Sequence, residues 1–176
     1  AGDDQNLQVR ELERSEERDG RAPVTYTLVP FTSRDGAARQ VTAMDFSPDG
    51  RLLAVSSHDG TVRIWGTENW ELLYEPLRGH KNIVYRVRFN ATGDLLVSGS
   101  QDGLALVWSV ASGDLVARLA PDTDWVYGVT FCRTSNGVVT AGANGVLKLW
   151  EFDARGEATC AEFEPQPLQK DAPHLG

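Results

Sequence analysis

The sequence has few of the residues that build metal sites and disulfide frameworks. Among its 176 residues are three histidines and two cysteines, Cys132 and Cys160, which lie far apart. No CxxC pair or histidine cluster accompanies them, so neither a zinc site nor a disulfide framework is expected. A few unpaired thiols are ordinary in reducing compartments. We therefore expect a cytoplasmic protein that holds no metal and no cofactor.

Long apolar runs and excess positive charge are missing as well. No stretch of ~18 apolar residues occurs, so the sequence predicts no membrane-spanning helix and no membrane partner. The 17 Lys and Arg residues are outnumbered by 25 Asp and Glu residues, which gives a formal net charge of −8. A negative surface repels a phosphate backbone, so nucleic acid is not an expected partner.

What the sequence does contain is an internal repeat. The segments 41–65, 84–108 and 126–150 align with one another, and each begins with valine and ends with tryptophan. The tryptophans lie 43 and 42 residues apart. This period is typical of four-stranded propeller blades, which repeat every ~40–45 residues. Seventeen glycines and eight prolines also fit a chain of many short strands joined by tight turns.

Within each repeat, apolar residues recur at every second position, which is the pattern of a β-strand. In the second repeat this pattern predicts strands over 84–89, 95–100, 104–108 and 115–119. The pair Asp102-Gly103 predicts a hairpin turn. The sequence therefore indicates an all-β fold in which each repeat forms four strands.

The three repeats resemble those of the WD-repeat family. The matching features are the pair Gly79-His80, the turn FSPDG at 46–50 and the segment HDGTVRIW at 58–65. The resemblance covers residues 24–163 and implies a β-propeller built from four-stranded antiparallel blades. The aspartate that usually follows the last tryptophan of the repeat is absent, and its place is taken by Gly66, Ser109 and Glu151.

The repeat divides the chain into a half blade, three blades and a tail, at 1–31, 32–78, 79–120, 121–164 and 165–176. The half blade is predicted because residues 1–12 align with 141–152 without a gap. Residues 1–12 would then hold a third strand, residues 24–31 a fourth strand, and residues 13–21 a charged loop between them. An acidic leader, disordered or helical, is the alternative for this segment.

About three and a half blades make an incomplete ring, because propellers typically close with about four to eight blades. Open blade edges and uncovered blade faces invite association. We therefore expect either a fragment of a longer propeller or copies that assemble into a ring. The fragment is the favoured interpretation, and self-association through the open edges is the other.

One set of polar residues imitates the triad of a hydrolase. The resemblance places a histidine, a serine and an aspartate of the second repeat in a hydrogen-bonded tetrad with a tryptophan, namely His80, Ser98 (or Ser100), Asp102 and Trp108. In the family this network is buried and fixes the turn, and a satisfied buried network specifies structure without catalysing a reaction. The sequence also lacks a GxSxG motif. We expect no enzyme activity.

The other two repeats keep the tetrad only in part. The first has Asp59 and Trp65, but no Gly-His pair precedes it. The third has Asn144 and Trp150, and Asp122 lies near the position of the missing histidine. A complete network is therefore expected in the second repeat alone.

The resemblance also implies where a protein partner binds. Partners of WD-repeat proteins dock on one face of the ring, called here the top face. It is formed by residues at the start of the innermost strand and before the turn aspartate. By alignment these are Ile83, Tyr85 and Gln101 in the second repeat, Trp125, Tyr127 and Ala143 in the third, and Gln40, Thr42 and His58 in the first. Large aromatics with polar tips are enriched in binding hot spots. Packing of these aromatics between blades is the alternative.

The sequence thus predicts a scaffold or sensor module that binds a protein or peptide partner on its top face. Its repeats look similar to the WD repeats of large multidomain bacterial regulators. A fragment of a propeller-containing enzyme and a self-assembling structural propeller are the alternatives. An enzyme site needs convergent acids, histidines or a metal, and the three histidines of the chain make this alternative the weaker one.

Overall fold

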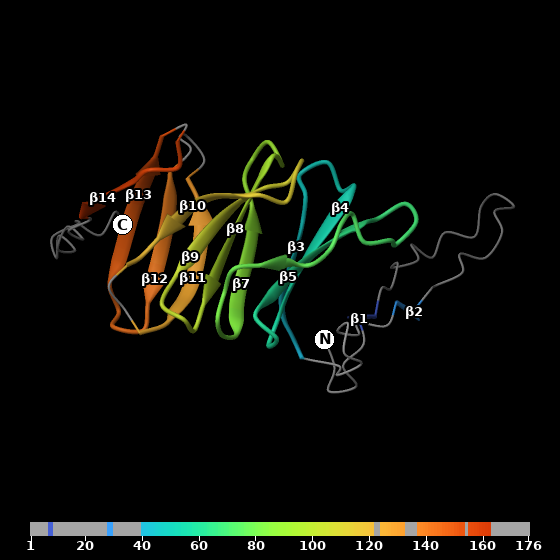
Figure 1. The fold of residues 1–176 in the computed structure, drawn as a ribbon, viewed down its shortest axis with the longest axis horizontal. Helices are drawn as coiled ribbons and strands as arrows, with labels where there is room; N and C mark the ends of the chain where they lie inside the picture. Colours follow the sequence, from blue (N-terminus) through green and yellow to red (C-terminus); the bar gives the residue numbers. More distant parts are fainter. Residues whose placement is uncertain are drawn as a thin grey trace, which may run out of the picture.

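A computed structural model describes residues 7–8, 28–29, 40–121, 124–132, 137–153 and 155–162. All regular structure in these residues is β-strand. Three four-stranded antiparallel sheets follow one another along the chain. In Figure 1 the sheets stand side by side in chain order, from the sheet that contains β3 to the sheet that contains β14. The predicted all-β propeller architecture of four-stranded antiparallel blades is confirmed.

Each sheet is a meander in which consecutive strands are neighbours. Blade 1 consists of β3 (Val41–Phe46), β4 (Leu52–Ser57), β5 (Thr61–Gly66) and β6 (Leu77–Arg78). Blade 2 consists of β7 (Val84–Phe89), β8 (Leu95–Ser100), β9 (Ala105–Ser109) and β10 (Leu115–Leu119). Blade 3 consists of β11 (Val126–Phe131), β12 (Val138–Gly142), β13 (Leu147–Phe152) and β14 (Ala158–Glu162).

The predicted blade segments each contain one of these sheets. Two further short strands, β1 (Leu7–Gln8) and β2 (Leu28–Val29), pair antiparallel and lie in the segments assigned to the predicted half blade. The remainder of that half blade, including the charged loop 13–21, lies outside the described residues, as does the tail 165–176. The half blade therefore stays a prediction.

The third strand of blade 2 was predicted over 104–108 and is found at Ala105–Ser109, so both of its ends differ by one residue. The difference at its start has a clear physical reason. The third strand of blade 2 begins at Ala105 and not at Leu104. The backbone N–H of Leu104 donates to the carboxylate of Asp102 at 3.1 Å, so this residue completes the turn. Gly103 has φ +79°, a left-handed conformation that glycine adopts without strain, and this explains the Asp-Gly pair at the turn.

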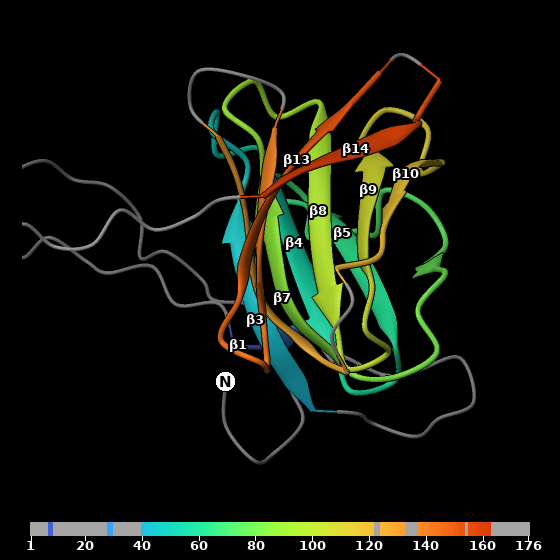
Figure 2. The same ribbon diagram turned by 90° about the vertical axis from the view of Figure 1, so that its left-hand side faces the viewer.

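The core lies between the blades and not within any one of them. One apolar cluster joins Ala54, Val62 and Ile64 of blade 1 to buried residues of blade 2, among them Val87 and Trp108. A second cluster joins blade 2 to blade 3. Figure 2 shows the sheets one behind another, with β3 and β7 on one side and β9 and β10 on the other. The innermost strands β3, β7 and β11 are also in contact with one another in chain order.

Candidate functional site

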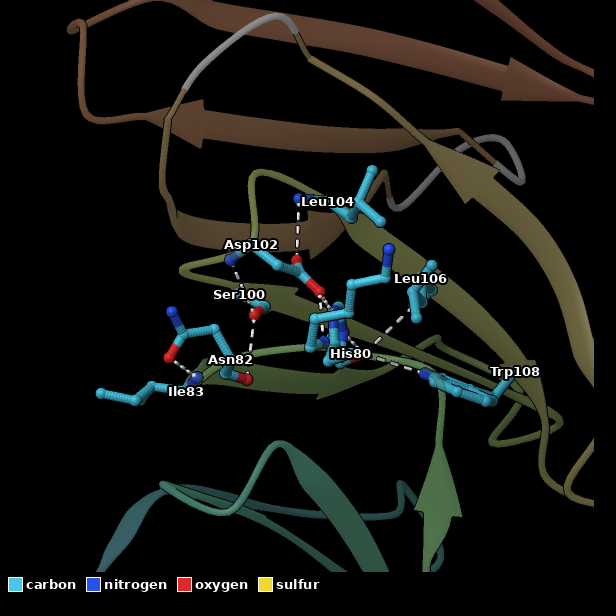
Figure 3. A network of polar contacts seen from close by, with 10 residues as sticks. His80, Asn82, Ile83, Ser100, Asp102, Leu104, Leu106 and Trp108 are labelled. Atoms are coloured by element: carbon cyan, nitrogen blue, oxygen red, sulfur yellow. Dashed lines mark hydrogen bonds and ion pairs between the residues drawn. The ribbon is translucent and has the colours of Figure 1, made fainter.

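The tetrad of blade 2 is complete in the structure (Figure 3). The His80 ring bridges Asp102 and Ser98, with Nδ1 3.1 Å from Asp102 Oδ2 and Nε2 2.8 Å from Ser98 Oγ. Trp108 Nε1–H donates to the same Ser98 oxygen at 2.9 Å. Because a carboxylate can only accept, the Nδ1–H of His80 donates to Asp102, while Nε2 forms its hydrogen bond with the serine hydroxyl. Every polar side-chain atom of the tetrad thus has a partner.

The structure also decides between the two serine candidates. Ser98 joins His80 and Trp108, whereas Ser100 Oγ donates to the backbone carbonyl of Asn82 at 3.2 Å. Ser98 has no exposed surface, and the His80 side chain is only 1% exposed. A serine nucleophile must reach a substrate carbonyl, and this hydroxyl is enclosed on all sides. The Ser98 hydroxyl is therefore closed to a substrate in this structure.

The network changes the pKa of the Asp102 carboxyl group. Burial raises the pKa of its carboxyl, but the hydrogen bonds from His80 and from the backbone N–H of Lys81 outweigh this effect and lower the pKa to about 2, from 3.8. The Lys81 N–H lies 2.8 Å from Asp102 Oδ2. The carboxylate therefore fixes the chain just before β7 as well as the turn that follows β8.

The lowered pKa predicts a loss of stability in acid. Since the folded-state pKa lies below the unfolded value, the stabilisation is fully present above about pH 4 and is lost as the pH falls through about 2. We expect a loss of about 2 kcal/mol from this group, measured as the free energy of unfolding in urea at a series of pH values. Asp102→Asn is the control and should show a shallower acid dependence. Equal slopes in both proteins would contradict the assignment.

Blade 1 replaces the missing histidine with an arginine that sequence reasoning did not single out. Arg63 lies at the position of Leu106 in blade 2, and its side chain is 3% exposed. Its guanidinium donates to Asp59 Oδ2 at 3.0 Å and to Thr61 Oγ1 at 2.6 Å. Burial raises the pKa of Asp59, but the hydrogen bonds from Thr61 and Arg63 outweigh it and hold the pKa below its usual value. The turn of blade 1 is therefore fixed by a buried ion pair.

The tryptophans of the three blades differ in how their indole N–H is satisfied. Trp150 Nε1–H donates to Thr140 Oγ1 at 2.9 Å, in the same way as Trp108 donates to Ser98. In blade 1 the equivalent position is Val55, which has no acceptor, and Trp65 Nε1 is buried without a hydrogen-bond partner. The Asn144 carbonyl oxygen accepts from Val146 N–H at 3.1 Å, the bond that Asp102 makes with Leu104. Asp122 lies outside the described residues.

The positions predicted for the top face are held by the same backbone bond in all three blades. The residue before the turn donates its N–H to the carbonyl of the residue before the innermost strand, at 3.0 Å in blade 1 and 2.9 Å in blades 2 and 3. These pairs are His58 and Gln40, Gln101 and Ile83, and Ala143 and Trp125. The three sets of residues therefore lie at equivalent places.

A β-bulge at the start of each innermost strand sets the direction of one side chain predicted for the top face. The strand register shifts between Val41 and Ala43, between Val84 and Arg86, and between Val126 and Gly128. The residues left unpaired are Thr42, Tyr85 and Tyr127. A bulge redirects the side chain of the extra residue, and bulges are frequent beside functional sites. Period-two reasoning from the sequence did not predict this feature.

Three of the predicted residues form an aromatic cluster, defined here as Tyr85, Trp125 and Tyr127. The ring centroids of Tyr85 and Tyr127 lie 5.1 Å apart, and Trp125 stands edge-on to Tyr127 at 5.7 Å. Tyr85 and Trp125 lie 6.4 Å apart. Trp125 is 39% exposed and Tyr127 44% exposed, so the contact between blades leaves much of both rings at the surface.

The other predicted top-face residues do not join this cluster. The Thr42 hydroxyl is bound to Ser56 Oγ and donates to the Val84 carbonyl, which ties blade 1 to blade 2. Ile83 and Gln101 are half-buried, and His58 is exposed. Among the described residues no group of three or more His, Cys, Asp or Glu side chains could hold a metal ion. No helix in this part of the chain is long and apolar enough to cross a membrane.

Three radially packed antiparallel sheets with a buried tryptophan in each third strand define an arc of a β-propeller. A family model described as "WD domain, G-beta repeat" matches residues 29–66, 70–109 and 113–151, which together are more than half of the chain. The chain belongs to the WD-repeat family.

Several known proteins are similar to this chain. The human F-box-like/WD repeat-containing protein TBL1Y is 33% identical over 103 residues, which cover 55% of this chain and 19% of that protein. The COMPASS component SWD3 of Saccharomyces cerevisiae is 29% identical over 148 residues, covering 79% of this chain and 46% of that protein. The solved structure of U3-55K has a TM-score of 0.65 at 20% identity and covers 73% of this chain and 41% of that one.

These comparisons cover the relatives only in part. The chain spans about a fifth of TBL1Y and slightly less than half of SWD3. Both relatives are eukaryotic, so they give no support to the expected bacterial lineage, which stays a prediction. The likeness to the U3-55K structure bears on the fold alone.

Proposed function

We propose that this chain is a protein-binding scaffold module whose partner, a protein or peptide segment, docks on the aromatic cluster of the top face. The observation that carries the proposal is a cluster of three aromatic rings from two adjacent blades, in which Trp125 and Tyr127 are exposed and Tyr85 is half-buried. The module would act without a cofactor and without catalysis. The cytoplasmic location and a sensor role inside a larger regulator stay predictions.

The composition of the cluster supports this role. Tyrosine and tryptophan bring large apolar area with few rotatable bonds, and their hydroxyl and indole groups form hydrogen bonds at the rim of an interface. Such residues dominate measured hot spots. The rings are held by mutual contact and by the bulges beneath Tyr85 and Tyr127, so little conformational freedom is lost on binding.

The relatives support a role in assemblies. One of them is described as a component of COMPASS and another as an F-box-like/WD repeat-containing protein. A scaffold built from repeated blades presents a broad rigid surface to a partner, as repeat architectures generally do. Fold alone does not name the partner, and the proposal rests on the exposed cluster.

A selection of phage-displayed random peptides on the immobilised chain tests the proposal. Enriched peptides should bind the wild type and lose at least about tenfold in affinity to Trp125→Ala and to Tyr127→Ala, measured by fluorescence anisotropy. Leu73→Ala is the matched control, because Leu73 is 47% exposed but lies between β5 and β6, away from the cluster. Peptides that bind all four proteins equally would overturn the proposal.

A further inference from the structure

The segment between β5 and β6 exposes two adjacent leucines on the outer side of blade 1. Leu72 is 39% exposed and Leu73 is 47% exposed. In Figure 1 this segment is the green loop that projects from the sheet of blade 1. Its residues, 67–76, include three exposed glutamates and neither lysine nor arginine. The rim patch is defined here as the two leucines together with two of these glutamates, Glu68 and Glu71.

A leucine at this place is exposed even in a blade that is flanked on both sides. Leu72 pairs with Trp65, and Leu115 pairs with the equivalent Trp108 in blade 2. Blade 2 packs against blade 1 and against blade 3, and Leu115 is still 40% exposed. Adjacent blades therefore do not cover the start of the outer strand, where this leucine lies.

The backbone around the two leucines is fixed by hydrogen bonds on both sides of the blade. The backbone N–H of Leu73 donates to the Ile64 carbonyl of β5 at 2.8 Å. The hydroxyl of the next residue, Tyr74, donates to the Val110 carbonyl of blade 2 at 3.3 Å. Since the segment is already ordered, little of its conformational freedom would be lost when a partner binds.

Trp70 anchors the same segment in a strained conformation. It has φ +55°, whereas the equivalent turn residues of blades 2 and 3 are glycines, Gly113 and Gly156, with φ +77° and +78°. A bulky side chain is disfavoured in this conformation, so the contacts of the tryptophan ring must offset the strain. The ring packs against the apolar cluster that contains Val55 and Trp65. Strained residues of this kind are concentrated at binding sites.

The outer edge of blade 1 is poorly suited to the addition of a strand. The strand β6 has two residues, and the four residues 73–76 lie opposite only two residues of β5, between Val62 and Trp65. An added strand pairs with a regular row of backbone groups, and this edge is interrupted. A partner at the rim patch would therefore bind through its side chains.

We propose that the rim patch binds a basic amphipathic helix of a partner protein. The apolar side of the helix contacts Leu72 and Leu73, and its lysine or arginine residues pair with Glu68 and Glu71. Such a helix gathers its apolar residues on one side with charges beside them, which complements exposed leucines bordered by carboxylates. Glu71 accepts a hydrogen bond from the neutral Asn69 amide at 2.8 Å and so keeps its charge.

This surface is separate from the one proposed above. The two leucines belong to the outer side of blade 1, whereas the aromatic cluster lies at the innermost strands of blades 2 and 3. The inference goes beyond the top-face scaffold role and does not rest on it.

The test uses the whole chain and a labelled peptide of about 14 residues, with leucines on one side of a helix and lysines on the other. We expect binding that weakens as salt is added, measured by fluorescence anisotropy. A peptide of the same composition, with its leucines spread around the helix, should bind at least about fivefold more weakly. Absence of binding, or equal affinity for the two peptides, would overturn the proposal.

Blade 2 supplies matched controls, because Leu115 and Asp114 occupy the places of Leu72 and Glu71. Leu72→Ala should lower the affinity about fivefold and Glu71→Gln about threefold at low salt, whereas Leu115→Ala and Asp114→Asn should bind like the wild type. Equal losses in the two blades would contradict the assignment.

Trp125→Ala separates this test from the peptide selection on the top face. It should bind the basic peptide like the wild type, because the aromatic cluster takes no part in the contact. A loss in Trp125→Ala as large as that in Leu72→Ala would place the peptide on the top face and overturn the rim-patch proposal.

Discussion

Replacement of Trp108 by alanine is expected to lower the free energy of unfolding by about 3–5 kcal/mol. Trp108 is 2% exposed and belongs to the apolar cluster that joins blades 1 and 2. Its ring lies so close to Gly79 that an added Cβ there would lie 2.8 Å from the indole. The neighbouring side chains come from two sheets, so they cannot collapse fully into the space left. Urea unfolding followed by fluorescence and by circular dichroism measures the loss.

A phenylalanine series separates the hydrogen bond of the tryptophan from its packing. Trp108→Phe removes a donor from Ser98, whereas Trp65→Phe removes an N–H that has no partner. The first substitution should therefore cost about 1 kcal/mol more than the second, since a buried tetrad loses one of its bonds. Equal costs would show that the indole N–H of Trp108 contributes nothing to stability.

The architecture could be predicted from the sequence because the repeat is periodic at two scales. Tryptophans 43 and 42 residues apart set the blade length, and period-two apolar residues set the strands within it. The strand β8 was predicted over 95–100 and is found there. These patterns can be seen in one sequence because every blade must bury the same two faces and therefore repeats the same apolar positions.

The tetrad of blade 2 was within reach of sequence reasoning because all of its members belong to one repeat. The residues that replace the tetrad in blade 1 could not be predicted from the sequence. Arg63 lies in an apolar strand, and only its position beside Asp59 in three dimensions explains why a guanidinium is buried there. The bulge at Tyr85 was not predicted either. The pattern of apolar and polar residues in a strand does not reveal which residue is the extra one.

The ion pair of blade 1 gives the second large expected effect. Arg63→Leu places in blade 1 the residue found at this position in blade 2, yet it should lower the free energy of unfolding by about 3 kcal/mol. Blade 2 has His80 to bond its aspartate, whereas blade 1 has no Gly-His pair, so Asp59 would keep only its bonds with Thr61. This loss of stability is at the lower end of the range for a buried ion pair that loses one partner. The reason is that the Asp59 side chain is 13% exposed and retains some hydration.

The double variant Asp59→Asn with Arg63→Leu distinguishes the loss of the partner from the loss of packing. Removal of both charges leaves no buried carboxylate, and replacement of a buried ion pair by neutral residues is often nearly neutral. We therefore expect the double variant to recover most of the stability that Arg63→Leu loses, measured by urea unfolding at neutral pH. Stability that falls further in the double variant would mean that the side chain of Arg63 acts through its apolar contacts and not through Asp59.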